Sequence, residues 1–230
     1  MAAPVYEGSG AAAHAASGVA TVSPTFPSGI AANDLLALVV ERNNTAGPGA
    51  SASGFVSRGV LAGDNPSIQL LTKTAAGTES GTLAVTVAST SVKIAKIYRF
   101  SNVDTAAPIH VAWASFSNST AATDMTPAMP SVTTTISETM AVALLDSSGD
   151  IIGDGTDPTG ESGGSWIFRS AERPAGANAH AFSLYTAAMA SAGTISGGAA
   201  AYSGASASWN ERVCSFALKG ADDLRPQSVM

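Results

Sequence analysis

One short apolar stretch, residues 34–42, constrains the fold more than any other part of the chain. Six apolar residues in succession, 35–40, are followed by Glu41 and Arg42 and then by a loop rich in Asn, Gly and Pro. Six residues cannot cross a bilayer, since a membrane helix needs about 20. A short apolar run bounded by turn residues predicts a strand that is buried on both faces. A helix of two turns is the alternative, because Leu and Ala also favour helix.

The same pattern returns in the second half of the chain. Residues 138–146 again set an acidic residue before an apolar run and another acidic residue after it. A Pro-X-X-Pro segment precedes each copy, at residues 24–27 and 127–130. Internal similarity usually means that one structural unit is used twice, so we predict two similar halves, about 12–104 and 125–222.

The rest of the chain favours short strands. The clearest alternation is at Leu83, Val85 and Val87, which are separated by small or hydroxyl-bearing residues. About twelve to fourteen short strands, with no convincing helix, are typical of a β-sandwich or jelly roll. We therefore predict an all-β, jelly-roll-like β-sandwich built from two similar halves, with little or no helix. Residues 12–222 are expected to form this single domain, preceded by an N-terminal arm, 1–11, and followed by a tail, 223–230.

The composition favours a subunit of an assembly. Charged residues make up 12% of the chain, about half the usual share. Ser, Thr, Ala and Gly must therefore cover much of the surface. A surface poor in Lys and Glu loses little side-chain entropy and hydration when a partner covers it.

Other functions are disfavoured by charge and by the N-terminal sequence. The net charge is −6, and the Lys and Arg residues are scattered, which argues against nucleic-acid binding. The first residues have neither the basic start nor the apolar core of a signal peptide, and no apolar run is long enough for a membrane span. A single Cys excludes an internal disulfide and fits synthesis in a reducing cytoplasm.

An acidic, glycine-rich loop is the one metal candidate. It contains Asp146, Asp150, Asp154, Asp157 and Glu161. Carboxylate oxygens are the ligands that Ca²⁺ prefers, and the candidate ligands are Asp150, Asp154, Asp157 and Glu161. The spacing does not match an EF-hand loop, and a solvated acidic loop is the alternative that we favour. No other cofactor is expected.

The three tryptophans differ in their expected environment. Trp113 and Trp166 alternate with small or polar residues in predicted strands, which favours the core for both. Trp209 follows a run of Ser, Ala and Gly, and we expect it to be exposed. An exposed indole can stack on a sugar ring, so Trp209 is a candidate glycan contact.

No catalytic motif is present in the sequence. His14, His110 and His180 are far apart and lack the spacing of a zinc site, so we expect structural roles for them. There is no Gly-X-Ser-X-Gly elbow, no phosphate-binding loop and no dinucleotide fingerprint. We therefore predict a protein that is not an enzyme.

Two stretches, together with the two-fold pattern, carry a family resemblance. Residues 33–40 and the closing residues 216–221 resemble small β-sandwich proteins of tailed-bacteriophage virions. These serve as capsid decoration (cement) proteins, head spikes or tail-associated adhesins. The resemblance implies a virion protein that is made in the host cytoplasm. It also implies a homo-oligomer, with a trimer expected, that contacts the major capsid protein or other virion proteins.

The leading hypothesis is therefore a decoration protein that stabilises the phage shell, with no role for nucleic acid or membrane. The alternative is a tail or spike adhesin that binds a glycan of the host surface. A secreted enzyme is the third hypothesis, and it lacks both a signal peptide and a matched acid–base pair.

Overall fold

The computed structural model describes residues 2–63, 65–88, 91–118, 128–147, 152–153, 156–172, 181–199, 202–203 and 211–221. These residues form strands, turns and connecting segments, and no helix occurs among them. The predicted all-β class is confirmed.

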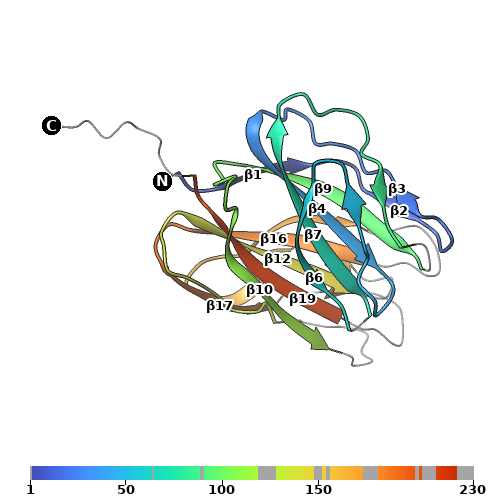
Figure 1. The fold of residues 1–230 in the computed structure, drawn as a ribbon. Coiled ribbons are helices and arrows are strands. Elements are labelled where there is room, and N and C mark those ends of the chain that lie inside the picture. The colour runs from blue at the N-terminus through green and yellow to red at the C-terminus, as the bar shows by residue number, and fades with distance from the viewer. Residues whose placement is uncertain are drawn as a thin grey trace.

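Two large antiparallel sheets form the centre of the molecule (Figure 1). The first has the order β1 (Val5–Ser9), β9 (Lys93–Ser101), β4 (Ala32–Arg42), β7 (Ser67–Ala76) and β6 (Val56–Leu61), and β2 (Ala13–Ala15) also pairs with β9. The second has the order β10 (Ile109–Asn118), β19 (Glu211–Lys219), β12 (Thr139–Ser147), β16 (Ala181–Met189) and β15 (Ile167–Glu172). The two apolar runs seen in the sequence are the central strands β4 and β12.

Three smaller sheets complete the described fold. One has the order β3 (Thr21–Val22), β8 (Val85–Thr86) and β5 (Ser51–Ala52). Another has the order β11 (Val132–Thr134), β17 (Gly193–Ala199) and β14 (Thr159–Ser162). The last pairs β13 (Ile152–Gly153) with β18 (Tyr202–Ser203). We call the two three-stranded sheets the outer sheets.

The sheets stack in four layers, with a separate apolar core between each adjacent pair. The central core lies between the large sheets and takes Leu35, Ala37 and Val39 from β4. Leu36 and Leu38, on the opposite face of the same strand, pack under one outer sheet. The other outer sheet covers the second large sheet in the same way. The prediction of a strand buried on both faces is therefore confirmed, and the described fold has three apolar cores, one between each pair of adjacent layers.

The two halves match in detail. In both large sheets an edge strand has a bulge at an arginine, Arg58 in β6 and Arg169 in β15. The Nε of Arg58 donates to Thr72 Oγ1 at 2.7 Å, and the Nε of Arg169 donates to Thr186 Oγ1 at 2.8 Å. A bulge places one extra residue in a strand and turns its side chain away from the regular alternation. The same device at the same register shows how closely the halves resemble each other.

The first residues of the chain belong to the body of the molecule. Val5–Ser9, within the segment predicted as an arm, form the edge strand β1, because Tyr6 packs on Tyr98 and Phe100 of β9. The described chain also ends where it begins: the N–H of Ala2 donates to the carbonyl of Ala221 at 3.0 Å. Both ends of the body therefore meet at one place.

Candidate functional site

The structure describes two of the four predicted calcium ligands. Asp157 Oδ1 accepts a hydrogen bond from the N–H of Phe168 at 2.7 Å, and Glu161 lies on β14 opposite Gly197. Asp150 and Asp154 lie outside the described residues. Within the part of the chain that the structure describes, no group of three His, Cys, Asp or Glu side chains is placed to hold a metal ion. Calcium binding by this loop stays a prediction.

The tryptophans divide between core and undescribed segments. Trp166 is buried in the core under the second outer sheet. Trp113 is half-buried and packs on Phe216, with 5.1 Å between the ring centroids. Trp209 lies outside the described residues, so the glycan contact stays a prediction.

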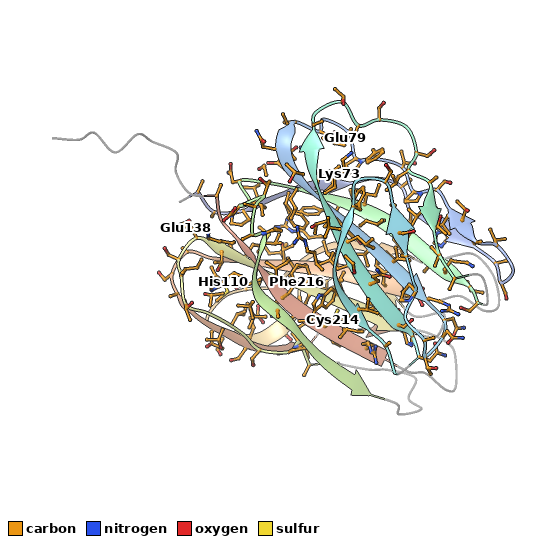
Figure 2. All side chains as sticks on the ribbon, in the orientation of Figure 1. Lys73, Glu79, His110, Glu138, Cys214 and Phe216 are labelled. Atoms are coloured by element: carbon orange, nitrogen blue, oxygen red, sulfur yellow. The ribbon has the colours of Figure 1, made fainter. Side chains whose placement is uncertain are left out.

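The described histidines do not form a site. His14 is exposed on β2, and His110 Nε2 accepts a hydrogen bond from the N–H of Thr135 at 3.2 Å. His180 lies outside the described residues. His110 and Glu138 both lie at the end of the second sheet where β12 begins (Figure 2).

A buried polar cluster occupies one end of the central core. Glu41 ends the apolar run of β4 and Asp146 ends that of β12, and neither side chain is exposed to water. Arg212 lies directly opposite Asp146 on β19, and Cys214 follows on the same strand. Cys214 and Phe216 lie along β19, within the central core (Figure 2).

Burial sets the protonation of this cluster. It raises the pKa of the Glu41 carboxyl well above its usual value. Burial also raises the pKa of Asp146, the charge of Glu41 raises it further, and Arg212 opposes the increase. The Cys214 thiol is likewise held neutral, because burial and then the charge of Asp146 raise its pKa.

No local feature of the sequence predicts this buried cluster. An acid at the end of an apolar run normally marks the exit of a strand into water, and the sequence pattern places Asp146 with the acids of the loop that follows it. The structure separates Asp146 from that loop and puts it in the core. The signal that the sequence does contain is that Glu41 and Asp146 each directly follow the apolar run in the two copies of the repeated pattern.

A second polar cluster joins the large sheets along one side. The Lys96 ammonium of β9 pairs with the Glu172 carboxylate of β15. Next to it, the hydroxyls of Tyr98 and Ser170 are hydrogen-bonded at 3.2 Å. The Arg169 guanidinium lies 5.1 Å from the centre of the Tyr6 ring, a cation–π contact. We call this cluster of Lys96, Glu172, Tyr98, Ser170 and Arg169 the charged corner.

The outer sheets present hydroxyl groups to solvent. Thr21, Thr86 and Ser51 are exposed neighbours in one outer sheet. In the other, the hydroxyls of Thr133 and Thr194 are 2.8 Å apart, and those of Ser162 and Ser196 are also 2.8 Å apart. Glu161 is the one charged residue on the six strands of these two sheets. Covering such faces removes few ions from water.

Edge strands of the two large sheets carry exposed apolar side chains. On β6, Val56 and Val60 are 55% and 47% exposed, and on the equivalent strand β15, Ile167 is 40% exposed. A strand at the edge of a sheet has backbone groups that can pair with another chain. The bulges at Arg58 and Arg169 interrupt both edges and restrict such pairing.

The fold and these surfaces define a class of protein: a layered all-β sandwich whose outer faces carry hydroxyl groups and few charges, and whose edge strands have bulges. The chain matches no protein-family model, no curated protein and no solved structure. None of the described residues belongs to a helix long and apolar enough to cross a membrane. The arrangement offers surfaces for packing, and the Glu41 and Asp146 carboxyls are buried beneath the sheets.

Proposed function

We propose that the chain is a non-enzymatic structural protein of a bacteriophage virion, a capsid decoration (cement) protein that stabilises the shell by packing against its neighbours. The observation that carries the proposal is the pair of outer sheets, whose exposed strands present hydroxyl groups and a single charge. Faces of this kind lose little hydration when they are covered, which is the property that a permanently packed subunit needs.

The position of the chain ends supports the same proposal. Ala2 and Ala221 pair, so the two ends of the described body lie side by side at one point. A subunit in a shell can use such a point to contact its neighbours. We expect self-association, with a trimer as the order, and contact with the major capsid protein or another virion protein.

The first test is the mass of the purified protein in solution, alone and after mixing with intact tailed-phage capsids. A defined oligomer that co-sediments with the shells and raises their melting temperature supports the proposal. A protein that stays in solution when capsids sediment contradicts it.

Added charge tests whether the outer sheet of β11, β17 and β14 makes the contact with the capsid. The variant Thr133→Glu/Thr194→Glu places two carboxylates on exposed positions of that face, and we expect it to abolish co-sedimentation. The matched control, Thr78→Glu/Ser80→Glu, adds the same charge to exposed positions of a loop and is expected to co-sediment like the unmodified chain. Equal loss in both variants would point to net charge and not to the face.

The adhesin hypothesis is the alternative, and it depends on Trp209. Saturable binding on a glycan array that Trp209→Ala removes, by a protein that ignores capsids, would replace the decoration proposal.

A further inference from the structure

Arg58, on the edge strand β6, has an exposed side chain with a single partner in its own chain. Its Nε donates to Thr72 Oγ1, and it makes no other hydrogen bond, ion pair or ring contact among the described residues. Every other lysine or arginine whose side chain the structure describes contacts an acid, an aromatic ring or a backbone carbonyl. The Thr72 bond holds the guanidinium in place and leaves both Nη groups for a partner, and a carboxylate fits such a pair of donors.

The equivalent arginine of the second half has the cover that Arg58 lacks. The Tyr6 ring of β1 lies over the Arg169 guanidinium, whereas no ring of the described chain lies over Arg58. Val56 and Val60, on the same strand as Arg58, are both exposed, and the strands β6, β7 and β10 contain no acidic residue. A guanidinium flanked by exposed apolar side chains is typical of residues that anchor a protein–protein contact.

Glu138 is the corresponding unpaired acid of the second half. It lies eight residues before Asp146, as Asn33 lies eight residues before Glu41. Both have left-handed backbone, with φ 70° at Asn33 and φ 54° at Glu138. Asparagine tolerates this conformation, whereas glutamate is strained in it. The Glu138 carboxylate has no hydrogen-bond or ion-pair partner in the described chain, so no contact within its own fold accounts for a glutamate at this position.

The surroundings of Glu138 are small and uncharged. Its carbonyl accepts a hydrogen bond from the N–H of Gly220 at 3.1 Å, next to the paired residues Ala2 and Ala221. Glu138 therefore lies where the two ends of the described body meet, at the end of the second sheet (Figure 2). Arg58 and Glu138 of one chain do not contact each other. Each half thus leaves one charge of opposite sign unpaired on the surface.

We propose that Arg58 of one copy forms an ion pair with Glu138 of a second copy when the protein self-associates. The inference rests on the self-association that the proposed decoration function requires, and it names the contact. Two copies that each carry a net charge of −6 repel each other, so their contact needs a local pair of opposite charges. One patch of each copy can meet a different patch of its neighbour in a closed dimer or in a ring.

The test is sedimentation equilibrium of the purified full chain without capsids. We expect a defined oligomer, and we expect Arg58→Glu to raise its dissociation constant roughly tenfold or more, because two carboxylates then face each other. Glu138→Arg is expected to act in the same way, and the double variant Arg58→Glu/Glu138→Arg is expected to restore association. The control Thr78→Glu/Ser80→Glu changes the net charge by the same amount as Arg58→Glu and is expected to associate like the unmodified chain.

A further variant separates association from folding. Glu138→Asn removes the carboxylate and introduces the residue that the first half has at the equivalent position, Asn33. We expect weaker association together with equal or higher resistance to urea, because asparagine tolerates the left-handed backbone. A purely structural role of Glu138 would give lower resistance to urea and unchanged association. This variant keeps the test valid if Arg58→Glu does not fold.

Three results would each overturn the inference: an unmodified chain that stays monomeric, an oligomer that Arg58→Glu leaves intact, and a double variant that does not regain association. An intact Arg58→Glu oligomer that no longer co-sediments with capsids would assign Arg58 to the shell and not to a second copy. Capsid binding by the unmodified chain is measured separately by co-sedimentation, so failure of this contact and failure of the decoration function are distinct results.

Discussion

The two large sheets meet along two sides, and the two sides use different chemistry for the same contact. In the charged corner, Lys96 of β9 pairs with Glu172 of β15. Register places Cys214 of β19 at the position of Lys96, and Leu61 of β6 at the position of Glu172. We call this second side the apolar corner. The ion pair of the charged corner is therefore replaced by a thiol and a leucine in the apolar corner.

The aromatic contacts of the two corners differ in the same way. Tyr98 and Phe216 are equivalent, each opposite the matching residue of its central strand. Tyr98 uses its hydroxyl to bond Ser170, whereas Phe216 packs on the Trp113 ring beside Gly59. Gly59 and Ser170 are themselves equivalent bulge neighbours. The comparison teaches that sheet geometry and apolar alternation specify the layer contact, while the side chains that complete it can be polar or apolar.

The largest expected effect comes from breaking the ion pair on one side only. Glu172→Leu places in the charged corner the residue found in the apolar corner, and leaves the buried Lys96 ammonium without its carboxylate. We expect a loss of roughly 3 kcal/mol, at the lower end of the range for buried pairs because Glu172 is partly exposed. Urea unfolding measures it.

The double variant Lys96→Met/Glu172→Leu makes the charged corner resemble the apolar one. Well-packed apolar replacements of a buried pair are often neutral or stabilising, so most of the loss should be recovered. If the double variant is as unstable as Glu172→Leu, the two corners are not interchangeable and the comparison fails.

The next effect tests the apolar corner. A Cβ at Gly59 would lie 2.2 Å from Trp113 Nε1, and the ring that would have to move is packed on Phe216. We expect Gly59→Ala to cost about 1–3 kcal/mol, the usual range for overpacking. Thermal unfolding measures the loss, and Ser170→Gly, the opposite change at the equivalent position of the other corner, checks the asymmetry. Equal stability of Gly59→Ala and the unmodified protein would show that Trp113 moves freely.

A smaller effect is expected from the hydroxyl of Tyr98. Tyr98→Phe makes this residue identical to its equivalent, Phe216, and leaves the Ser170 hydroxyl without this partner. A typical hydrogen bond contributes about 1 kcal/mol, and we expect a loss of that size. In a double-mutant cycle with Ser170→Ala, the two losses should not add, since they remove the same bond. Full additivity would mean that the bond contributes nothing.

These contacts also show what the sequence can and cannot predict. The apolar run 35–40 predicted a strand covered on both faces, because burial of consecutive residues needs only local sequence to be recognised. Val85 and Val87, two residues apart, point inward as their alternation predicted. Alternation and run length carry the class of fold and the central strands.

The polar clusters depend on residues far apart in the chain and could not be predicted in the same way. Glu41 is buried at one end of a core to which β12 and β19 contribute, and both strands lie more than 90 residues away in sequence. Arg58 and Arg169 gain their roles from bulges, for which no local signal was present. Tyr6 holds β1 in the sheet through rings of β9, which turned an expected arm into an edge strand.

The two halves also differ at the turn that follows β7, and a variant of this turn is expected to have the smallest effect at neutral pH. After β7, the Glu79 carboxylate pairs with Lys73 at 2.9 Å and accepts hydrogen bonds from the N–H groups of Ala76 and Gly77. The three residues of the matching turn, between β16 and β17, include no acid. Lys73 and Glu79 lie together at this end of the first sheet (Figure 2). Burial opposes ionisation of Glu79, but the Ala76 N–H and Lys73 outweigh it and lower the pKa to about 2. Glu79→Gln should therefore cost below about 1 kcal/mol at neutral pH, as is usual for pairs near the surface.

The stability supplied by Glu79 depends on pH in the opposite direction to that of Glu41 and Asp146, because burial raises the pKa values of those two carboxyls. Because its folded pKa is lower than its unfolded value, the stability that Glu79 supplies is present above the unfolded pKa and is lost as the pH falls toward about 2. In Glu79→Gln the free energy of unfolding should fall less steeply as the pH is lowered, and its change between neutral and alkaline pH should stay the same. Asp146→Asn should instead alter the change between neutral and alkaline pH, because burial raises the pKa of Asp146. Urea unfolding on both sides of neutrality distinguishes them. A change in the alkaline limb of Glu79→Gln would mean that the turn and the central core are coupled, and the two halves would then have to be treated as one titrating unit.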